Sequence, residues 1–155
     1  MSRRPFVVDV ATLVRHSGGP GGPRREQRRG AIPDLVVGVS AVPEGAEVVV
    51  DVLLEPAQPG VLARGTVTAP WVGECRRCLG PASGEVRAEV GELFAERGDP
   101  ETTYPLSGEH LDLEPLARDA VLLGLPLAPL CRPHCRGLCP RCGADRNEGP
   151  CACPP

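Results

Sequence analysis

The sequence predicts an α+β fold with a mainly antiparallel β body, one helix and a cysteine-rich C-terminal tail. Valine- and threonine-rich runs, separated by glycine and proline turns, fill the middle of the chain and are typical of antiparallel strands. A later segment changes to the spacing of a helix. Six of the eight cysteines lie within the last 25 residues. We therefore expect a β-rich body over residues 1–127 and a tail over residues 128–155 that folds around bound metal and packs on the body.

The composition indicates a small hydrophobic core and argues against some classes of protein. Apolar residues make up 41% of the chain, but glycine and proline contribute 19 residues each, so bound metal would supply stability that the core lacks. The net charge of −3 argues against a protein that coats nucleic acid. No apolar run is long enough to span a membrane, and Asp9 and Arg15 interrupt the N-terminal apolar stretch. We expect a cytoplasmic protein.

The N-terminal part of the chain predicts one short strand and one irregular segment. Residues 5–10 have the composition of a strand, whereas residues 17–30 are polar and rich in glycine and proline, so we expect a flexible loop there. Guanidinium groups pair with phosphate oxygens, which makes RNA binding the favoured role of the arginines in this loop, and a solvated arm the alternative. These arginines are Arg24, Arg25, Arg28 and Arg29.

Three valine-rich runs then predict the main strands, at residues 35–42, 45–56 and 60–71. The last two are expected to pair in antiparallel fashion through the turn at residues 56–60. A further run at residues 84–96 places valine and alanine at every second position, with charged residues between them. This period of two predicts a strand with one buried face.

A helix is predicted over residues 112–123, after a polar loop at residues 97–109. Asp112 or its neighbour is a candidate cap, and Gly124 and Pro126 would end the helix. Its apolar positions share one face at helical spacing. They are Leu113, Leu116, Ala117, Ala120, Val121 and Leu123.

The cysteines form four closely spaced pairs, which is typical of structural zinc sites held by thiolates. Thiols stay reduced in the cytoplasm, so metal is favoured over disulfides. Within Cys139-Pro-Arg-Cys142, proline starts a tight turn and Gly143 permits a left-handed conformation. The nearby arginines Arg76, Arg77 and Arg141 would offset the negative charge of a four-thiolate site. The pairs are Cys75 with Cys78, Cys131 with Cys135, Cys139 with Cys142, and Cys151 with Cys153.

The spacing allows more than one division of the cysteines into metal sites. Loop-closure entropy favours a local tail site of Cys139, Cys142, Cys151 and Cys153, which leaves Cys75, Cys78, Cys131 and Cys135 to tie the β body to the tail. A single compact site of Cys131, Cys135, Cys139 and Cys142 is the alternative, and His134 can replace a cysteine as ligand. Cys153 is the weakest candidate, because a Cys-x-Cys pair is strained on one ion. Whether one or two ions bind stays open.

Other chemistry at the cysteines is less favoured. An iron–sulfur cluster also uses four thiolates, and Cys75 with Cys78 has the spacing of a redox dithiol. No histidine lies near a persuasive nucleophile, and no phosphate-binding or metalloprotease motif appears, so we do not expect an enzyme. A zinc-dependent adaptor in transcription or protein interaction is a further alternative. The helix counts against DNA binding, because Arg118 is its only basic residue.

The motifs together resemble the YceD family, over nearly the whole chain from Phe6 through the tail. The resemblance implies a non-enzymatic role in large-subunit ribosomal RNA accumulation, which is a part of ribosome biogenesis. The motifs are Cys75-Arg76-Arg77-Cys78-Leu79, Leu125-Pro126, Leu130-Cys131, Cys135-Arg136-Gly137-Leu138-Cys139-Pro140-Arg141-Cys142-Gly143, and Asn147-Glu148 before Cys151 and Cys153.

Two kinds of partner follow from this resemblance and from the charges. Zinc would hold loops that present arginines to ribosomal RNA phosphate or to a ribosomal protein, chiefly Arg76 and Arg77, with Arg136 and Arg141. The acidic stretch at residues 85–114 is suited to a basic ribosomal protein by charge complementarity. Which RNA or protein is contacted, and the oligomeric state, stay open at the level of sequence.

Overall fold

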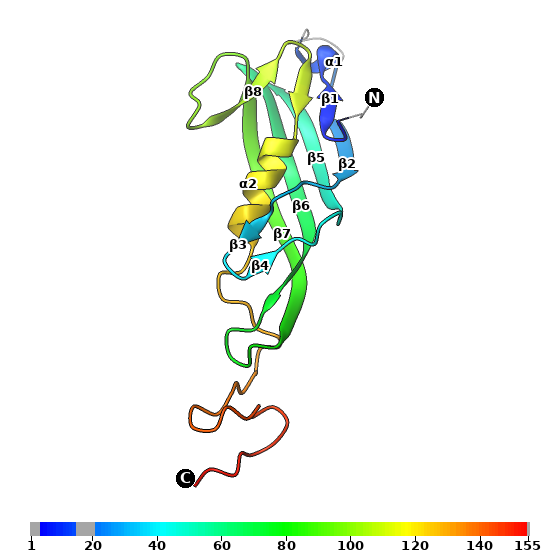
Figure 1. Cartoon of the computed structure of the whole chain (residues 1–155). Coiled ribbons are helices and arrows are strands. Elements are labelled where there is room, and N and C mark those ends of the chain that lie inside the picture. Colours follow the sequence, from blue (N-terminus) through cyan, green and yellow to red (C-terminus); the bar gives the residue numbers. More distant parts are fainter. Residues whose placement is uncertain (1–3, 15–20, 155) are drawn as a thin grey trace.

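The computed structural model describes residues 4–14 and 21–154 and consists of one strongly curved sheet with a helix packed on it (Figure 1). The sheet order is β1-β9-β8-β7-β6-β4-β3, and β5 also pairs with β6 and carries β2 on its outer edge. Among the strand pairs of the described residues, only β7 with β8 is parallel. The helices are α1 (Ala11–Val14) and α2 (Glu114–Gly124). The strands are β1 (Val7–Asp9), β2 (Arg24–Gly30), β3 (Val36–Val37), β4 (Ser40–Ala41), β5 (Val48–Ala57), β6 (Gly60–Glu74), β7 (Pro81–Ala95), β8 (Thr103–Ser107) and β9 (His110–Asp112).

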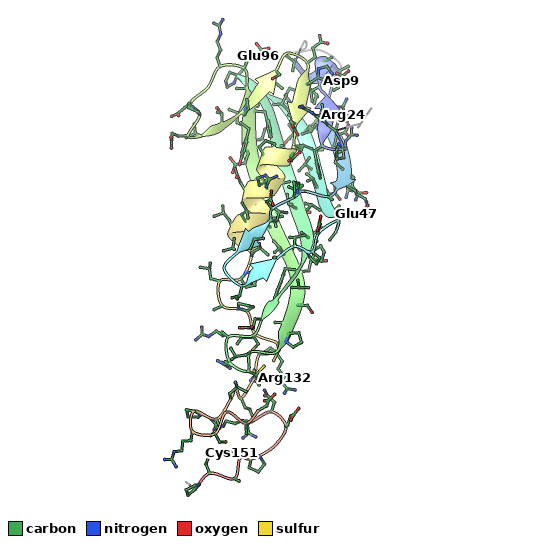
Figure 2. All side chains as sticks on the ribbon, viewed as in Figure 1. Asp9, Arg24, Glu47, Glu96, Arg132 and Cys151 are labelled. Carbon is green, nitrogen blue, oxygen red and sulfur yellow. The ribbon has the colours of Figure 1, made fainter. Side chains whose placement is uncertain are left out.

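The curvature of the sheet brings its two ends together. The guanidinium of Arg24 on β2 donates a hydrogen bond to the carbonyl of Asp9 on β1. A Cβ added to Gly30 would lie 2.7 Å from Cγ of Pro5, so the two segments are in close contact. Figure 2 shows the labelled residues Asp9 and Arg24 side by side at this seam. The body is therefore a partly closed barrel.

The concave face of the sheet forms the core. On β5, Val48, Val50, Val52 and Leu54 are fully buried, as the period-two pattern of valine and leucine requires. α2 covers this face and buries its apolar residues against β6 and β7, so burial of apolar surface holds the helix in place. The buried residues of the helix are Leu116, Ala117 and Val121.

The hairpin of β6 and β7 projects beyond the rest of the body and carries the first C-x-x-C at its tip. The two strands stay paired as far as Glu74 and Pro81, and residues 75–80 form the turn. The hairpin reaches away from the end of the body where α1 lies, and the tail passes its tip and extends beyond it (Figure 1). The buried hydroxyl of Ser40 donates to the carbonyl of Pro126 over 2.6 Å, which anchors the start of the tail to the body.

Several elements match the sequence-based expectations. The strand at residues 5–10 contains β1, and β5 and β6 pair in antiparallel register through the expected turn, with Ala57 opposite Gly60. The run at residues 84–96 lies in β7, which stays a strand to Ala95. α2 ends at Gly124 as predicted, and the Asp112 carboxylate accepts a hydrogen bond from the backbone N–H of Glu114.

The expectation of a flexible loop at residues 17–30 is wrong for its second half. Residues 24–30 form β2 and pair with β5 from Arg24 opposite Leu54 to Gly30 opposite Val48. The outer edge of β5 offers unpaired backbone groups, and satisfying them outweighs the polar composition of this segment. Residues 15–20 lie outside the described residues.

Three further differences concern the later part of the chain. The expected loop at residues 97–109 contains β8, which pairs with β7, so tertiary pairing again overrides a polar composition. Leu123, assigned to the buried face of the helix, is 88% exposed. The last turn of α2 meets β7 through Gly124 instead, where an added Cβ would lie 2.5 Å from Cγ1 of Val86. The short helix α1 was not expected from the sequence.

Candidate metal centres

The turn between β6 and β7 has the backbone geometry of a metal-binding knuckle. The N–H of Cys75 donates to the carbonyl of Gly80 over 2.8 Å, and the N–H of Leu79 donates to the carbonyl of Cys75 over 2.9 Å. Leu79 has a φ of 60°, which closes the turn in the left-handed region. The N–H of Arg77 points at Sγ of Cys75, 3.5 Å away. The turn therefore presents two sulfurs on one side.

The second C-x-x-C repeats this hydrogen-bond pattern residue for residue. The N–H of Cys139 donates to the carbonyl of Ala144, and the N–H of Gly143 donates to the carbonyl of Cys139, both over 2.8 Å. Gly143 has a φ of 73°, as its expected left-handed role requires. Gly143 thus occupies the place that Leu79 occupies in the first turn.

The sulfurs gather into two groups of four, and in each group all four lie within 4.8 Å of one another. Cys75, Cys78, Cys131 and Cys135 form the first group, in which the hairpin tip meets the tail. Cys139, Cys142, Cys151 and Cys153 form the second group, which lies within the tail. Figure 2 labels Arg132 where the tail meets the hairpin and Cys151 toward the far end of the tail. This grouping is the division that loop closure favours, and His134 belongs to neither group.

The separations between sulfurs suit one metal ion in each group. Sγ of Cys75 lies 3.8 Å from Sγ of Cys135, and Sγ of Cys78 lies 3.7 Å from Sγ of Cys131. In the second group, Sγ of Cys139 lies 3.5 Å from Cys151 and 4.0 Å from Cys153. A tetrahedral ion with metal–sulfur bonds of about 2.3 Å places its sulfurs about 3.8 Å apart. Both groups can therefore hold a metal ion.

The first cysteine of each knuckle has a lowered pKa. Hydrogen bonding from the backbone N–H of Cys78 lowers the pKa of Cys75 to about 6, and the N–H groups of Cys142 and Arg141 lower the pKa of Cys139 to about 6. Loss of hydration raises the pKa of Cys131 to about 12. The interaction with Cys142 raises the pKa of Cys153 to about 12. In each group the fold thus stabilises at least one thiolate in the absence of an ion.

The two groups are joined through Asn147, which lies in the loop between Cys142 and Cys151. Its side-chain amide donates to Sγ of Cys135 over 3.3 Å, and hydrogen bonding from Asn147 is the main cause of the lowered pKa of Cys135. The amide oxygen of Asn147 accepts from the N–H of Arg136 over 2.8 Å. The motif residues include Asn147, but the sequence alone assigned it no role.

Arginines surround the first group. The backbone N–H of Arg76 donates to the carbonyl of Pro129, which fixes the residue while its guanidinium stays exposed. The guanidinium of Arg77 donates to the carbonyl of Cys135 over 3.1 Å and so ties the hairpin to the tail. Within the described residues the guanidiniums of Arg76, Arg132 and Arg136 have no hydrogen-bond or ion-pair partner. These groups are free to meet an anion.

The arginines of β2 lie elsewhere, on the body, and are already paired. Arg25 forms a bidentate pair with Asp51, at 2.8 and 2.6 Å. Arg24 and Arg28 both face Glu26, at 2.9 and 3.1 Å, and Arg29 lies 4.0 Å from Glu47. The view of a flexible arm with unpaired guanidiniums is therefore wrong. Their contact with RNA stays a prediction.

α2 does not have the surface of a DNA-reading helix. Arg118 pairs with Glu114 at 3.3 Å and donates to the carbonyl of Pro33 at 2.8 Å, so its guanidinium is engaged within the body. No helix among residues 4–14 and 21–154 is long and apolar enough to cross a membrane.

Fold and site together define a β-rich domain whose long hairpin and C-terminal tail carry two four-cysteine groups that can hold metal. The family model for "Large ribosomal RNA subunit accumulation protein YceD" matches residues 63–155, which include both groups. The chain belongs to the YceD family.

The curated relatives are mycobacterial and plant proteins. An uncharacterized protein of Mycobacterium tuberculosis strain H37Rv is 40% identical over 155 residues, covering 94% of this chain and 73% of the relative. An uncharacterized protein of Mycobacterium leprae is 38% identical, covering 91% of this chain and 67% of the relative. The maize "Large ribosomal RNA subunit accumulation protein YCED homolog 1, chloroplastic" is 36% identical over 53 residues, 34% of this chain and 18% of its own length. No solved structure matches the chain.

Proposed function

We propose that this protein is a non-enzymatic, cytoplasmic ribosome biogenesis factor that supports the accumulation of large-subunit ribosomal RNA. The name of the family supports this general role. The observation that carries the mechanism is the hairpin tip, where Arg76 is fixed through its backbone while its guanidinium stays free. A rigid turn that presents an unpaired guanidinium is suited to a phosphate of folded RNA.

Zinc is the proposed ion in both groups. All-sulfur, four-ligand sets at tetrahedral separations are the preferred structural sites of this ion, and such closed shells leave no position for a substrate. The ion would supply folding free energy to a tail that has little regular structure of its own. The first site would lock the tail to the hairpin, and the second would shape the loop that carries Asn147.

The proposed RNA-facing surface is formed by the free arginines around the first group. Arg76, Arg132 and Arg136 come from the hairpin tip and the adjoining tail, so one folded unit presents charges that are far apart in the sequence. The two zinc sites would each carry a double negative charge, which these arginines partly offset. Contact with RNA is then local to the guanidiniums and does not require a basic protein.

The other functions considered have less support. A redox dithiol at Cys75 and Cys78 would need an accessible sulfur, and Cys75 is fully buried in the first four-sulfur group. A DNA-binding adaptor would need a free basic helix, and Arg118 is engaged by Glu114 and Pro33.

Affinity purification from cells, with RNA sequencing and metal analysis of the same sample, tests the proposal. We expect enrichment of large-subunit RNA precursors together with zinc. The double variant Arg76→Ala/Arg132→Ala should lose the RNA and keep the zinc, whereas Arg97→Ala, which removes an exposed arginine from the connection between β7 and β8, should keep both. With a purified RNA fragment, the double variant should lower the salt slope by about 1.4 if each arginine meets one phosphate of a single strand. An unchanged RNA yield in the double variant would refute this surface.

A further inference from the structure

β7 leaves most of its outer edge unpaired. β8 pairs with it only from Leu93 to Ala95, so residues 82–92 have β6 on one side and no strand on the other. Within the described residues no backbone or side-chain hydrogen bond reaches this outer edge. An edge of this length offers alternate N–H and C=O groups for pairing with another extended chain.

A groove runs between this edge and α2. It has a volume of about 360 Å³, and the side chains of Val90, Leu116 and Ala120 give it an apolar floor. Leu123, 88% exposed on the last turn of α2, forms part of its rim. Figure 1 shows α2 lying along β7 below β8, so a strand added to the edge would lie beside the helix. Backbone pairing on one side and side-chain contacts with a helix on the other are the requirements of recognition by strand addition.

The groove continues into an acidic pocket of about 530 Å³, because Glu92, Tyr104 and Asp119 line both. Glu96 and Glu101 line the rest of the pocket, and Glu96 is labelled at this end of the molecule in Figure 2. The hydroxyl of Tyr104 donates to Asp119 over 2.7 Å, but the glutamates have no ion-pair partner among the described residues.

The acidic residues along the β7 edge and the pocket indicate which kind of ligand this surface would bind. Glu89 lies on the edge strand itself, and Arg87 is the one basic residue among those that line the groove and the pocket. Elsewhere on the body, acids such as Asp51 and Glu55 are paired with arginines. Unpaired acids beside an unpaired strand edge favour a partner that is both extended and positively charged.

We propose that the free edge of β7 and the groove beside α2 bind an extended, lysine- or arginine-rich segment of a protein by strand addition. Alternate side chains of the added strand would point to the apolar floor, and a basic side chain would enter the acidic pocket. This surface lies on the body, away from the cysteine groups, and does not depend on the RNA contact proposed above. Its test therefore contains no RNA.

The test uses the full chain loaded with zinc and a short fluorescein-labelled peptide in which lysine and valine alternate. We expect saturable binding by fluorescence anisotropy, and slower amide exchange at residues 84–92 in the complex. The same peptide with N-methyl groups on alternate residues keeps its charge but cannot pair along one edge, so one of its two methylation registers should not bind.

Two variants and a matched control locate the site. Glu89→Gln/Glu92→Gln and, separately, Leu123→Asp should each weaken binding by about fivefold or more, and neither change disturbs a buried apolar residue. Glu44→Gln/Glu47→Gln removes the same charge from another exposed part of the body and should leave binding unchanged. Absence of binding, equal binding of both N-methylated peptides, or equal weakening by the control pair would each overturn the proposal.

Discussion

The side-chain amide of Asn147 donates a hydrogen bond to Sγ of Cys135, so a residue from the loop of the second cysteine group supports a sulfur of the first. The contact spans 3.3 Å, and Asn147 is itself positioned by the Asp145 carboxylate and the N–H of Arg136. Hydrogen bonds to a ligand sulfur stabilise its thiolate form. The two groups are therefore expected to bind metal as a coupled pair.

The first prediction is that Asn147→Ala weakens zinc binding by the first group about 10- to 100-fold, because the change removes the side-chain amide that donates to Sγ of Cys135. Competition with a chromogenic chelator measures the release of each ion. The neighbouring residue provides the control, since Glu148→Ala removes an exposed side chain that has no hydrogen bond or ion pair among the described residues. Equal release from both variants would show that the contact adds nothing to the affinity.

The second prediction is that each chain binds two zinc ions, and that a chelator unfolds the tail before the body. Residues 128–154 have little regular structure, whereas the body has a continuous apolar core. Elemental analysis should give two zinc ions per chain. Amide exchange after chelation should rise in the tail and at the hairpin tip while β5 and β6 stay protected. One ion per chain, or iron with visible absorbance, would contradict the assignment.

The third prediction is that Cys75→Ser lowers the thermal midpoint more than Cys153→Ser does. Cys75 is fully buried where the hairpin meets the tail, so its loss detaches elements that are far apart in the sequence. Cys153 closes only a local loop, 4.0 Å from Cys139 at its sulfur. Thermal melts of the two zinc-loaded variants compare them directly. An equal or larger effect at Cys153 would mean that the second group holds the fold together.

The sequence predicts the two cysteine groups better than it predicts the structure of the surrounding surface. Cysteine spacing and loop closure are local properties, so they favoured the observed division of the cysteines over the alternative single site. The pairing of an edge strand depends on residues that are distant in the sequence. β2 forms because β5 offers unpaired backbone groups, and the composition of residues 24–30 alone does not indicate this pairing. The exposure of Leu123 likewise depends on which side of the last turn of α2 meets the sheet. For the same reason, the link from Asn147 to Cys135 could be found only in three dimensions.

The fourth prediction concerns the pair of Arg25 and Asp51. Hydrogen bonding from the guanidinium of Arg25 lowers the pKa of Asp51 below its ordinary value of 3.8. A lowered pKa in the folded state stabilises the protein above pH 3.8, and this contribution is lost as the pH falls through the folded value. Arg25→Ala should raise the pKa of Asp51, measured by NMR titration.

The stability difference between wild type and Arg25→Ala should accordingly be present at neutral pH and vanish in acid. Its size at neutral pH is small because the pair is exposed to solvent. Arg29→Ala is the control, since its guanidinium lies 4.0 Å from Glu47 and makes a weaker contact. A constant difference across the whole pH range would mean that Arg25 acts through packing and not through charge.

The last prediction follows from the equivalence of Leu79 and Gly143, which close the two knuckles with φ of 60° and 73°. A side chain in this conformation costs about 1 kcal/mol relative to glycine. Space does not limit the second position, because a Cβ on Gly143 would meet nothing within 4 Å. Gly143→Ala should therefore destabilise the zinc-loaded tail by about 1 kcal/mol through its backbone alone.

Leu79→Gly should be close to neutral, since relief of the left-handed strain is offset by the greater freedom of glycine in the unfolded chain. Gly22→Ala is the matched control, with open space and no positive φ, and should be neutral or slightly stabilising. Chelator titrations of the three variants give the free energies, and a neutral Gly143→Ala would refute the backbone equivalence of the two turns.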